Sequence, residues 1–329
     1  MTASTNDSPK IKRVPVQERS FTMGNFVGIN GYRVNRSLLK QRFAEGGYQL
    51  HETPHFLIFT RSVAPSLIVV HWFAPEEIDA NIGDYFVQEL KPLGILTDAQ
   101  NFGDLFGAIL FSISPYDTRR ALHLYGTNTL HQYQYLLNNA EDALPASQTT
   151  IYSFAKIYRR VCQLHVGQTF LDVGCSSGLL PLLVSERDSS LTQIVGVDIE
   201  TGPFPIVSAI AEEQHLQNIS FCQADVLANS FSTLGHFDTV VALHVLEHLT
   251  EADMYSALLN LLQVTSRRLI IAVPYEGETP EKVYGHVQLF NRAKLEAVGN
   301  WCLQHLDSPG RITVEDCAGG LLLVERYAS

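Results

Sequence analysis

The segment Thr169-Phe-Leu-Asp-Val-Gly-Cys-Ser-Ser-Gly178 decides the fold of the C-terminal half of this chain. Its first residues form an apolar run typical of a buried strand, and residues 179–186 after the turn have helical spacing. A glycine-containing turn between a strand and a helix lets a ligand approach the backbone, and the start of the helix offers free N–H groups. The segment therefore predicts a strand, a ligand-binding turn and a helix, in that order.

The same alternation of strands and helices continues on both sides of this segment. It predicts parallel β-α-β units, and strands that are apolar throughout are typical of a sheet covered on both faces. Near the C-terminus, two strand patterns flank Cys317-Ala-Gly-Gly320 and predict an antiparallel hairpin. We therefore predict an α/β fold with a doubly wound, mostly parallel seven-stranded sheet that ends in this hairpin. The predicted strands are residues 169–173, 193–198, 219–222, 238–243, 268–273, 311–315 and 321–325, and the predicted helices are 151–164, 179–186, 205–216 and 252–264.

The N-terminal third of the chain has a less regular pattern. Strand-like runs at residues 55–60 and 66–72 are separated by Arg61-Ser-Val-Ala-Pro65, which indicates a hairpin connection. Helical spacing occurs at residues 36–43 and 76–90. The predicted organisation is a flexible tail (1–20), a small α+β domain of unknown role (21–115), a helical connector (116–150) and the regular α/β domain (151–329).

Composition argues against several classes of protein. The 329 residues include 34 acidic and 23 basic ones, and a surface with a formal net charge of −11 repels the phosphates of nucleic acids. The five cysteines form no C-x-x-C pair, so neither a disulfide framework nor a zinc site is expected. No secretory signal or membrane-spanning apolar run is visible in the sequence. We therefore expect a cytoplasmic protein with a small-molecule partner and no membrane association, and homodimer formation stays open.

Acidic residues follow the next two predicted strands. Asp198 ends the strand at residues 193–198, where a carboxylate can accept hydrogen bonds from both hydroxyls of a ribose. Asp225 follows the strand at residues 219–222, where it can reach an adenine amino group. The glycine turn reads D-x-G-x-x-x-G rather than G-x-G-x-x-G, which counts against a pyrophosphate-binding turn. Each acid alone could simply cap a helix, but together with the turn they predict one crevice.

As a set, these motifs resemble those of the class I methyltransferases, nearest to their type-11-like group. The resemblance covers about residues 150–329 and rests on residues 170–178, on Val197-Asp198, on Ala224-Asp225 and on the run from Phe237-Asp238 to Leu249. It implies S-adenosyl-L-methionine as the cofactor, with its methionine part at the glycine turn, its ribose at Asp198 and its adenine at Asp225. The cofactor-binding residues that it implies are Asp172, Gly174, Cys175, Gly178, Asp198, Ile199, Asp225, Val226 and Leu243.

A group of histidines and a glutamate follows the fourth strand of this domain. His244, Glu247 and His248 have the spacing i, i+3 and i+4, which would place them on one face of a helix, and His286 comes later. The arrangement resembles the metal site of the ubiquinone-pathway O-methyltransferases and of the small-RNA 2′-O-methyltransferases, which carry E-x-x-E-H and a later histidine. The resemblance implies a divalent metal ion at His244, Glu247, His248 and His286, and the extra histidine favours a softer ion than magnesium.

The alternative reading of the same residues is a site without metal. Glu247 and His248 would then pack beside the cofactor, and His248 or His286 would act as the general base, with His244 as a further catalytic candidate. Both readings stay open at the level of sequence. Methyl transfer to a high-pKa hydroxyl needs either a base or a metal to remove the proton, so both suit the same reaction.

Missing motifs narrow the methyl acceptor. The fourth strand is followed neither by the N/D-P-P-Y/F sequence of adenine and glutamine N-methyltransferases nor by the Pro-Cys pair of cytosine C5 enzymes. Val273-Pro-Tyr-Glu276 is expected to line the acceptor side. This segment, the H-x-x-E-H strand end, Tyr284-Gly-His286 and the Cys-Ala-Gly-Gly hairpin also resemble mycofactocin-type glycan O-methyltransferases.

The sequence thus predicts O-methylation of a hydroxyl on a small metabolite, such as a sugar or a phenol. The N-terminal domain would shape the acceptor pocket or mediate dimerisation. Two alternatives remain at this stage: an RNA 2′-O-methyltransferase, which requires a basic groove across the site, and a cofactor-binding scaffold without turnover.

Overall fold

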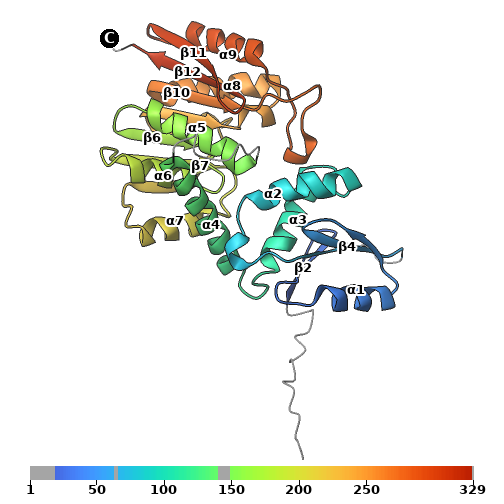
Figure 1. Ribbon diagram of the computed structural model, residues 1–329. Coiled ribbons are helices and arrows are strands. Elements are labelled where there is room, and N and C mark those ends of the chain that lie inside the picture. Colours follow the sequence, from blue (N-terminus) through green and yellow to red (C-terminus); the bar gives the residue numbers. More distant parts are fainter. Residues whose placement is uncertain (1–18, 63–65, 140–148, 328–329) are drawn as a thin grey trace, which may run out of the picture.

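The computed structural model describes residues 19–62, 66–139 and 149–327 (Figure 1). Most of the predicted tail, the end of the predicted hairpin connection and the end of the predicted connector lie outside the described residues. The described part contains two β-sheets, one in each half of the chain. In Figure 1 the N-terminal sheet (blue) lies at one end of the molecule, and the C-terminal sheet (green to red) lies at the other.

The C-terminal sheet confirms the predicted fold class. It has seven strands in the order β11-β12-β10-β9-β6-β7-β8, and only the strand pairs that involve β12 are antiparallel. Because β6 lies between β7 and β9, the turn after it opens where the strand order reverses. The strands are β6 (Thr169–Val173), β7 (Gln193–Asp198), β8 (Ile219–Gln223), β9 (Phe237–Leu243), β10 (Thr265–Val273), β11 (Gly310–Asp316) and β12 (Gly320–Arg326).

Alternate strand residues pack against helices on opposite faces of this sheet. Leu171 and Val173 of β6 belong to the core beneath α8 and α9, whereas Phe170 packs with α5 and α6. The apolar character of the strands therefore has a simple cause, since both faces are covered (Figure 1). The helices of this half are α5 (Thr150–Leu164), α6 (Leu179–Arg187), α7 (Phe204–Glu213), α8 (Glu251–Val264) and α9 (Arg292–Gln304).

The N-terminal half contains a five-stranded sheet in the order β1-β2-β5-β4-β3. The predicted strand runs are β4 (Phe56–Thr60) and β5 (Leu67–His71), which pair antiparallel as expected for a hairpin. The pattern gave no prediction for β1 (Ser20–Met23), β2 (Phe26–Asn30), β3 (Gln49–Glu52) or α3 (Ala99–Phe111). The exposed side chains of β3 lack the alternation that marks a half-buried strand. The remaining helices are α1 (Arg36–Glu45) and α4 (Thr118–Asn138).

The single helix predicted for residues 76–90 is wrong. The segment is instead broken into η2 (Pro75–Glu77), α2 (Asn81–Tyr85), the π-helical η3 (Phe86–Leu90) and η4 (Lys91–Leu93). One cause is Asp79, whose side chain accepts a hydrogen bond from the Asn81 backbone N–H at 2.9 Å. A side chain that bonds the local backbone in this way competes with the helical pattern. Because the segment is broken here, α2 can pack against α5 of the C-terminal half.

Several contacts join the N-terminal unit to the C-terminal half. Asp84 of α2 accepts hydrogen bonds from the backbone N–H of Thr150 at 2.8 Å and from its hydroxyl at 2.6 Å. Lys91 forms an ion pair with Glu281 at 2.5 Å. The ring of Phe102 in α3 packs edge-on against Tyr284, with 5.7 Å between centroids. The N-terminal unit is therefore fixed against the loop that carries residues 281–286.

The described helices include none that is both long and apolar enough to cross a membrane. The longest helix, α4, is polar on average and contacts elements of both halves, including α3, α5 and α7. This helix therefore connects the two halves of the structure.

We predict that Asp84→Ala lowers the free energy of unfolding by about 1–3 kcal/mol, because it leaves the first N–H group of α5 without an acceptor in a half-buried site. Urea unfolding followed by circular dichroism measures this. Asp98→Ala, which removes the exposed cap of α3, is the control and should cost less. Equal stabilities of the wild type and Asp84→Ala would show that this contact does not hold the two halves together.

Candidate active site

The turn after β6 is bonded to the end of β7. The backbone N–H groups of Gly174 and Cys175 both donate to the carbonyl oxygen of Val197, at 2.8 and 3.0 Å. The N–H of Ser176 donates to the Oδ2 of Asp198 at 2.8 Å. The predicted glycine turn and the predicted ribose-binding carboxylate therefore lie side by side.

Two glycines of this turn are required by its geometry. Gly174 and Gly178 have φ values of +71° and +69°, in the left-handed region that favours glycine. A Cβ atom on Gly174 would come within 2.5 Å of Val245, and one on Gly178 would come within 2.7 Å of the Phe221 ring. The turn thus packs tightly against the segment after β9 on one side and against β8 on the other.

The residues predicted to hold the nucleoside lie at the same sheet edge. The N–H of Ala224, next to Asp225, donates to the backbone carbonyl of Asp198 at 3.1 Å, so the ends of β7 and β8 are joined. Asp225 is exposed, and Ile199 is 58% exposed although it is a large apolar residue. Val226 is buried beneath them. An exposed apolar side chain beside two carboxylates suits the face and the polar edges of a nucleoside.

Asp172 and Cys175, and Leu243 at the end of β9, form the floor of this edge. All three are buried, and Asp172 is only 4% exposed. Burial, with a smaller contribution from the nearby charge of Asp198, raises the pKa of Asp172 to about 8. A buried carboxyl of this kind is ready to pair with a cationic group brought by a ligand.

His244 begins the segment after β9 in an uncommon conformation. Its φ is +55°, in the left-handed region, and its N–H donates to the carbonyl of Ala272 at 2.9 Å. Its Nδ1 lies 3.0 Å from Glu247, and its ring packs on Phe154 with 4.7 Å between centroids. A non-glycine residue held in this region often marks a functional segment.

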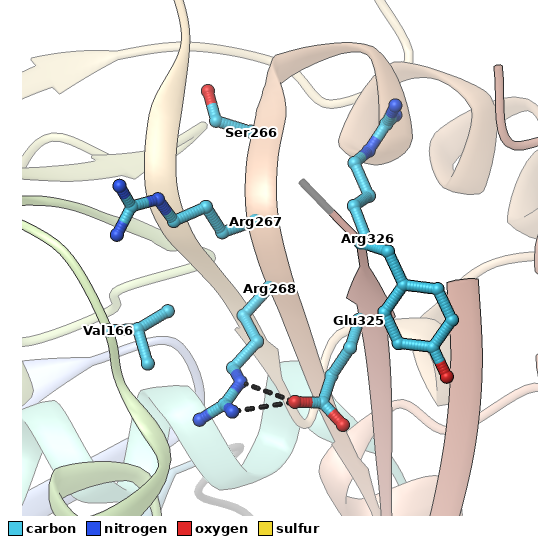
Figure 2. Close-up of a pocket in the computed structure, with 7 residues that line it drawn as sticks. Val166, Ser266, Arg267, Arg268, Glu325 and Arg326 are labelled. Carbon is cyan, nitrogen blue, oxygen red and sulfur yellow. Dashed lines mark hydrogen bonds and ion pairs between the residues drawn. The ribbon is translucent and has the colours of Figure 1, made fainter. Parts of the chain in front are cut away.

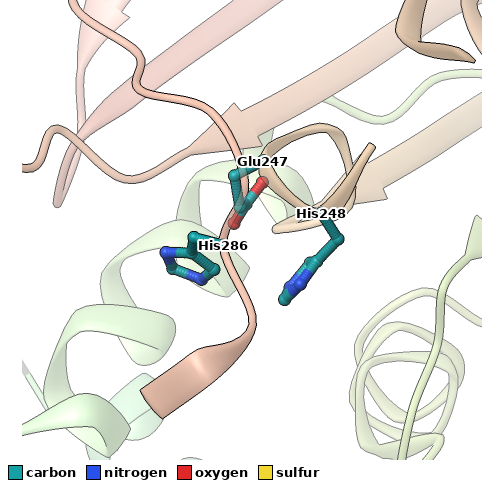
Figure 3. A group of neighbouring side chains, drawn as sticks. All are labelled: Glu247, His248 and His286. Carbon is teal, nitrogen blue, oxygen red and sulfur yellow. The ribbon is translucent and has the colours of Figure 1, made fainter. Parts of the chain in front are cut away.

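The structure brings Glu247, His248 and His286 together (Figure 3). One potential ligand atom of each lies within 4.8 Å of the others. The helix that would place His244 on the same face does not form; residues Leu246–His248 make one 3-10 turn (η7). His244 is therefore not part of this group of three, although it contacts Glu247.

Glu247 is unusual among these residues. It is fully buried, and within the described residues neither carboxylate oxygen accepts a well-aligned hydrogen bond, although the Nδ1 of His244 lies 3.0 Å from one of them. A buried carboxylate without such bonds is costly, and a cation bound beside it would remove the cost. The observation therefore fits a metal ion between Glu247 and the two imidazoles.

Each histidine of the group is held through its Nδ1 atom. The Nδ1 of His286 lies 2.5 Å from a carboxylate oxygen of Glu276, and the Nδ1 of His248 lies 3.3 Å from the carbonyl oxygen of Gly285. If each Nδ1 donates its proton to these oxygens, each Nε2 keeps a free lone pair for a metal or a proton. Burial lowers the pKa of His248, which favours its neutral form.

Sequence reasoning assigned no contact to several residues around this group. Glu276 was expected only to line the acceptor side, and in the structure its carboxylate contacts the Nδ1 of His286. Phe154 carried no signal at all, because nothing in the sequence of α5 distinguishes it from other apolar residues. Tyr284 lies 5.9 Å from the ring of His286 and also contacts Phe102. These contacts join segments far apart in the chain, so no local pattern reports them.

A hollow on the protein lies away from this edge. It is lined by the start of β10 and the end of β12, at the opposite edge of the sheet (Figure 2). Arg268 donates two hydrogen bonds to Glu325 there, at 3.0 and 2.6 Å. Its arginines are engaged in ion pairs with carboxylates, and none of the predicted site residues lines it.

The C-terminal half resembles known methyltransferases. Residues 170–267 match the sequence model of a family described as a methyltransferase domain. Part of the chain is 28% identical over 85 residues to the ubiquinone biosynthesis O-methyltransferase of Acinetobacter baumannii strain ACICU, which covers 26% of this chain and 35% of that protein. The (S)-tetrahydroprotoberberine N-methyltransferase of Eschscholzia californica is 26% identical over 100 residues, 30% of this chain and 28% of that protein. The chain thus spans about a third of the length of the curated relatives that it matches.

One similar solved structure is the magnesium protoporphyrin IX methyltransferase of Synechocystis PCC 6803 with bound S-adenosylhomocysteine. It is 15% identical, covers 75% of this chain and 98% of that chain, and superposes with a TM-score of 0.40. At that distance the likeness carries no argument about acceptors.

We predict that Asp172 makes the empty chain less stable as pH rises. The unfolded carboxyl ionises near its ordinary pKa of 3.8 and the folded one near 8, so between these values the folded chain holds one extra proton. The free energy of unfolding should then fall by about 1.4 kcal/mol per pH unit from this group. Urea unfolding at several pH values between 5 and about 8 measures this. The free energy of unfolding should change less with pH in Asp172→Asn than in the wild type. Identical slopes would contradict the buried, protonated state of Asp172.

Proposed function

We propose that this chain, which contains a class I S-adenosylmethionine-dependent methyltransferase domain, methylates a hydroxyl group of a small metabolite. The observation that carries the choice of oxygen is the buried Glu247 carboxylate without hydrogen bonds, facing His248 and His286. Of the methyl acceptors that such a site could serve, hydroxyl groups need a metal ion or a base most, because their pKa is high.

The cofactor would lie across the ends of β6, β7 and β8. S-Adenosylmethionine supplies an electrophilic methyl group on its sulfonium. The backbone N–H groups of Ser176 and Glu200 each donate a hydrogen bond to one carboxylate oxygen of Asp198. The remaining lone pairs of these oxygens would accept hydrogen bonds from the ribose hydroxyls. Asp225 and Ile199 would contact the adenine, and Asp172 would lie nearest the amino acid part. The residues Gly174, Cys175, Gly178, Val226 and Leu243 complete the predicted set.

The acceptor would approach beside His248 and His286. With a divalent ion bound, Glu247, His248 and His286 would hold it, and the ion would lower the pKa of an acceptor hydroxyl. One carboxylate and two imidazoles suit a softer ion than magnesium. Glu276 would keep the ring of His286 in place, as outer residues do in metal sites. Without an ion, the neutral His248 would serve as the proton acceptor, and His244 would orient Glu247.

The position of the N-terminal unit favours a small molecule over RNA as the methyl acceptor. Phe102 packs on Tyr284, and Lys91 pairs with Glu281, so this unit closes against the loop that carries His286. Tyr284 and Val287 of the loop are 36% and 55% exposed, which leaves apolar surface next to the histidines. Lys91, the cation that this unit places against the loop, is paired with Glu281, so its charge offers little attraction to an RNA phosphate chain.

The test is a methyl-transfer assay with isotopically labelled S-adenosylmethionine and a panel of sugars, phenols and catechols, with Mn²⁺, Co²⁺ or Zn²⁺ added or removed by a chelator. We predict that one hydroxylated class is methylated and that the chelator abolishes the reaction. Glu247→Gln should lower kcat/KM at least about 100-fold, and Glu276→Gln about 10-fold. Glu278→Gln, exposed in the same loop, is the matched control and should keep full activity.

Three results would contradict the proposal in different ways. Methylation of an amine or of RNA in place of a hydroxyl would overturn the acceptor. Full activity in the presence of the chelator, with Glu247→Gln also fully active, would overturn the metal. Cofactor binding without transfer to any acceptor class would favour a scaffold role.

A further inference from the structure

A second cavity lies in the N-terminal unit, at the side of α4. Its volume is about 340 Å³, large enough for a small organic molecule. Its walls combine aromatic rings with carboxylates, and the residues that matter here are His55, Trp72, Tyr85, Glu76, Glu77 and Asp79. None of them belongs to the site described above.

The aromatic wall is a set of rings packed on one another. His55 stacks on Tyr85 with 4.0 Å between centroids, and Phe73 stacks on Tyr85 at 5.8 Å. Trp72 already receives one cation, because the guanidinium of Arg36 lies 4.8 Å from its ring centroid. The cavity therefore presents the faces and edges of several rings, which attract positively charged groups.

The charge of the cavity is negative. Glu76, Glu77 and Asp79 line it, and none of them forms an ion pair within the described residues. The only arginine in the wall, Arg36, is paired with Glu52 at 3.0 Å, so its charge is already balanced. Burial raises the pKa of Tyr85, and the nearby negative charges of Asp79, Glu77, Asp84 and Glu89 add to this shift.

Asp79 is the buried carboxylate among these acidic residues. It is only 6% exposed, and its side chain accepts a hydrogen bond from the neutral backbone N–H of Asn81 at 2.9 Å. Burial raises its pKa, so its ionised form is held at a cost in the empty protein. A buried carboxylate with neutral partners, open to a cavity with aromatic walls, is the environment in which proteins bind organic cations.

We propose that this cavity binds an organic ammonium ion, as a ligand separate from the methyl donor and acceptor. The ammonium group would pair with Asp79 and Glu77, and its carbon substituents would contact Trp72 and Tyr85. Helix α2 separates the two sites: Asn81 and Tyr85 line the cavity, whereas Asp84 is bonded to Thr150 of α5. This inference does not depend on the proposed acceptor or metal.

Saturation-transfer difference NMR on the full chain tests it, with tetramethylammonium chloride and tert-butyl alcohol in the same sample. The two probes have similar size and shape, but only the first is charged. Excess S-adenosylhomocysteine is included, because its own amino group would occupy any cation site at the cofactor edge. We expect a saturable signal for tetramethylammonium and, at equal concentration, a signal about tenfold weaker for tert-butyl alcohol.

Substitutions of cavity residues test whether the tetramethylammonium signal comes from this cavity. Asp79→Asn keeps a hydrogen-bond acceptor while removing the charge, and should weaken tetramethylammonium binding about tenfold. Glu77→Gln changes an exposed residue and should fold normally, with binding weakened about threefold. Glu45→Gln, an exposed acid of α1 outside the cavity, is the charge-matched control and should bind as the wild type does.

The proposal is overturned if both probes give equal signals, if Glu77→Gln and Glu45→Gln bind alike, or if S-adenosylhomocysteine displaces the ammonium ion. Displacement would assign cation binding to the cofactor edge instead. Normal binding of S-adenosylhomocysteine in every variant shows that a lost ammonium signal comes from the cavity and not from a failure of the methyltransferase domain.

Discussion

The interaction on which the rest of the structure depends is the bonding of the turn after β6 to the end of β7. The N–H groups of Gly174 and Cys175 share the carbonyl of Val197, and the N–H of Ser176 bonds Asp198. These bonds require left-handed glycines, and they fix the distance between the turn and the neighbouring carboxylate. The candidate cofactor site therefore follows from one local conformation placed at the reversal of strand order.

Much of this half could be predicted from sequence because its information is local. The run from Thr169 to Gly178, the strand ending at Asp198 and the terminal hairpin are each encoded by neighbouring residues. The N-terminal sheet could not be predicted in the same way: β3 is exposed and lacks alternation, and side-chain bonding by Asp79 breaks the helix that the spacing of residues 76–90 indicates. The grouping of Glu247 and His248 with His286 was expected, but the bond from His286 to Glu276 joins residues whose partnership no sequence spacing reveals.

The two halves meet at the place where the chemistry is proposed. The loop that carries His286 is held from one side by Glu247 and Glu276 of the C-terminal half. From the other side it is held by Phe102 and Lys91 of the N-terminal unit. The N-terminal unit thus has a structural part in the acceptor side, and its own acidic and aromatic cavity lies beyond α2. Val283 of the same loop is also buried in the core of the N-terminal unit, so a change in that unit can reach His286 through the loop.

The most direct test of the central claim is calorimetric titration of S-adenosylhomocysteine into the wild type, Asp198→Ala and the exposed control Glu213→Gln. We predict that the wild type and the control bind S-adenosylhomocysteine with a Kd of about micromolar order, and that Asp198→Ala binds it at least about tenfold more weakly. The loss is expected because Asp198 is the carboxylate that the turn aligns with the ribose. Absence of binding in all three proteins, or equal binding in all three, would contradict the assignment of the cofactor to the ends of β6, β7 and β8.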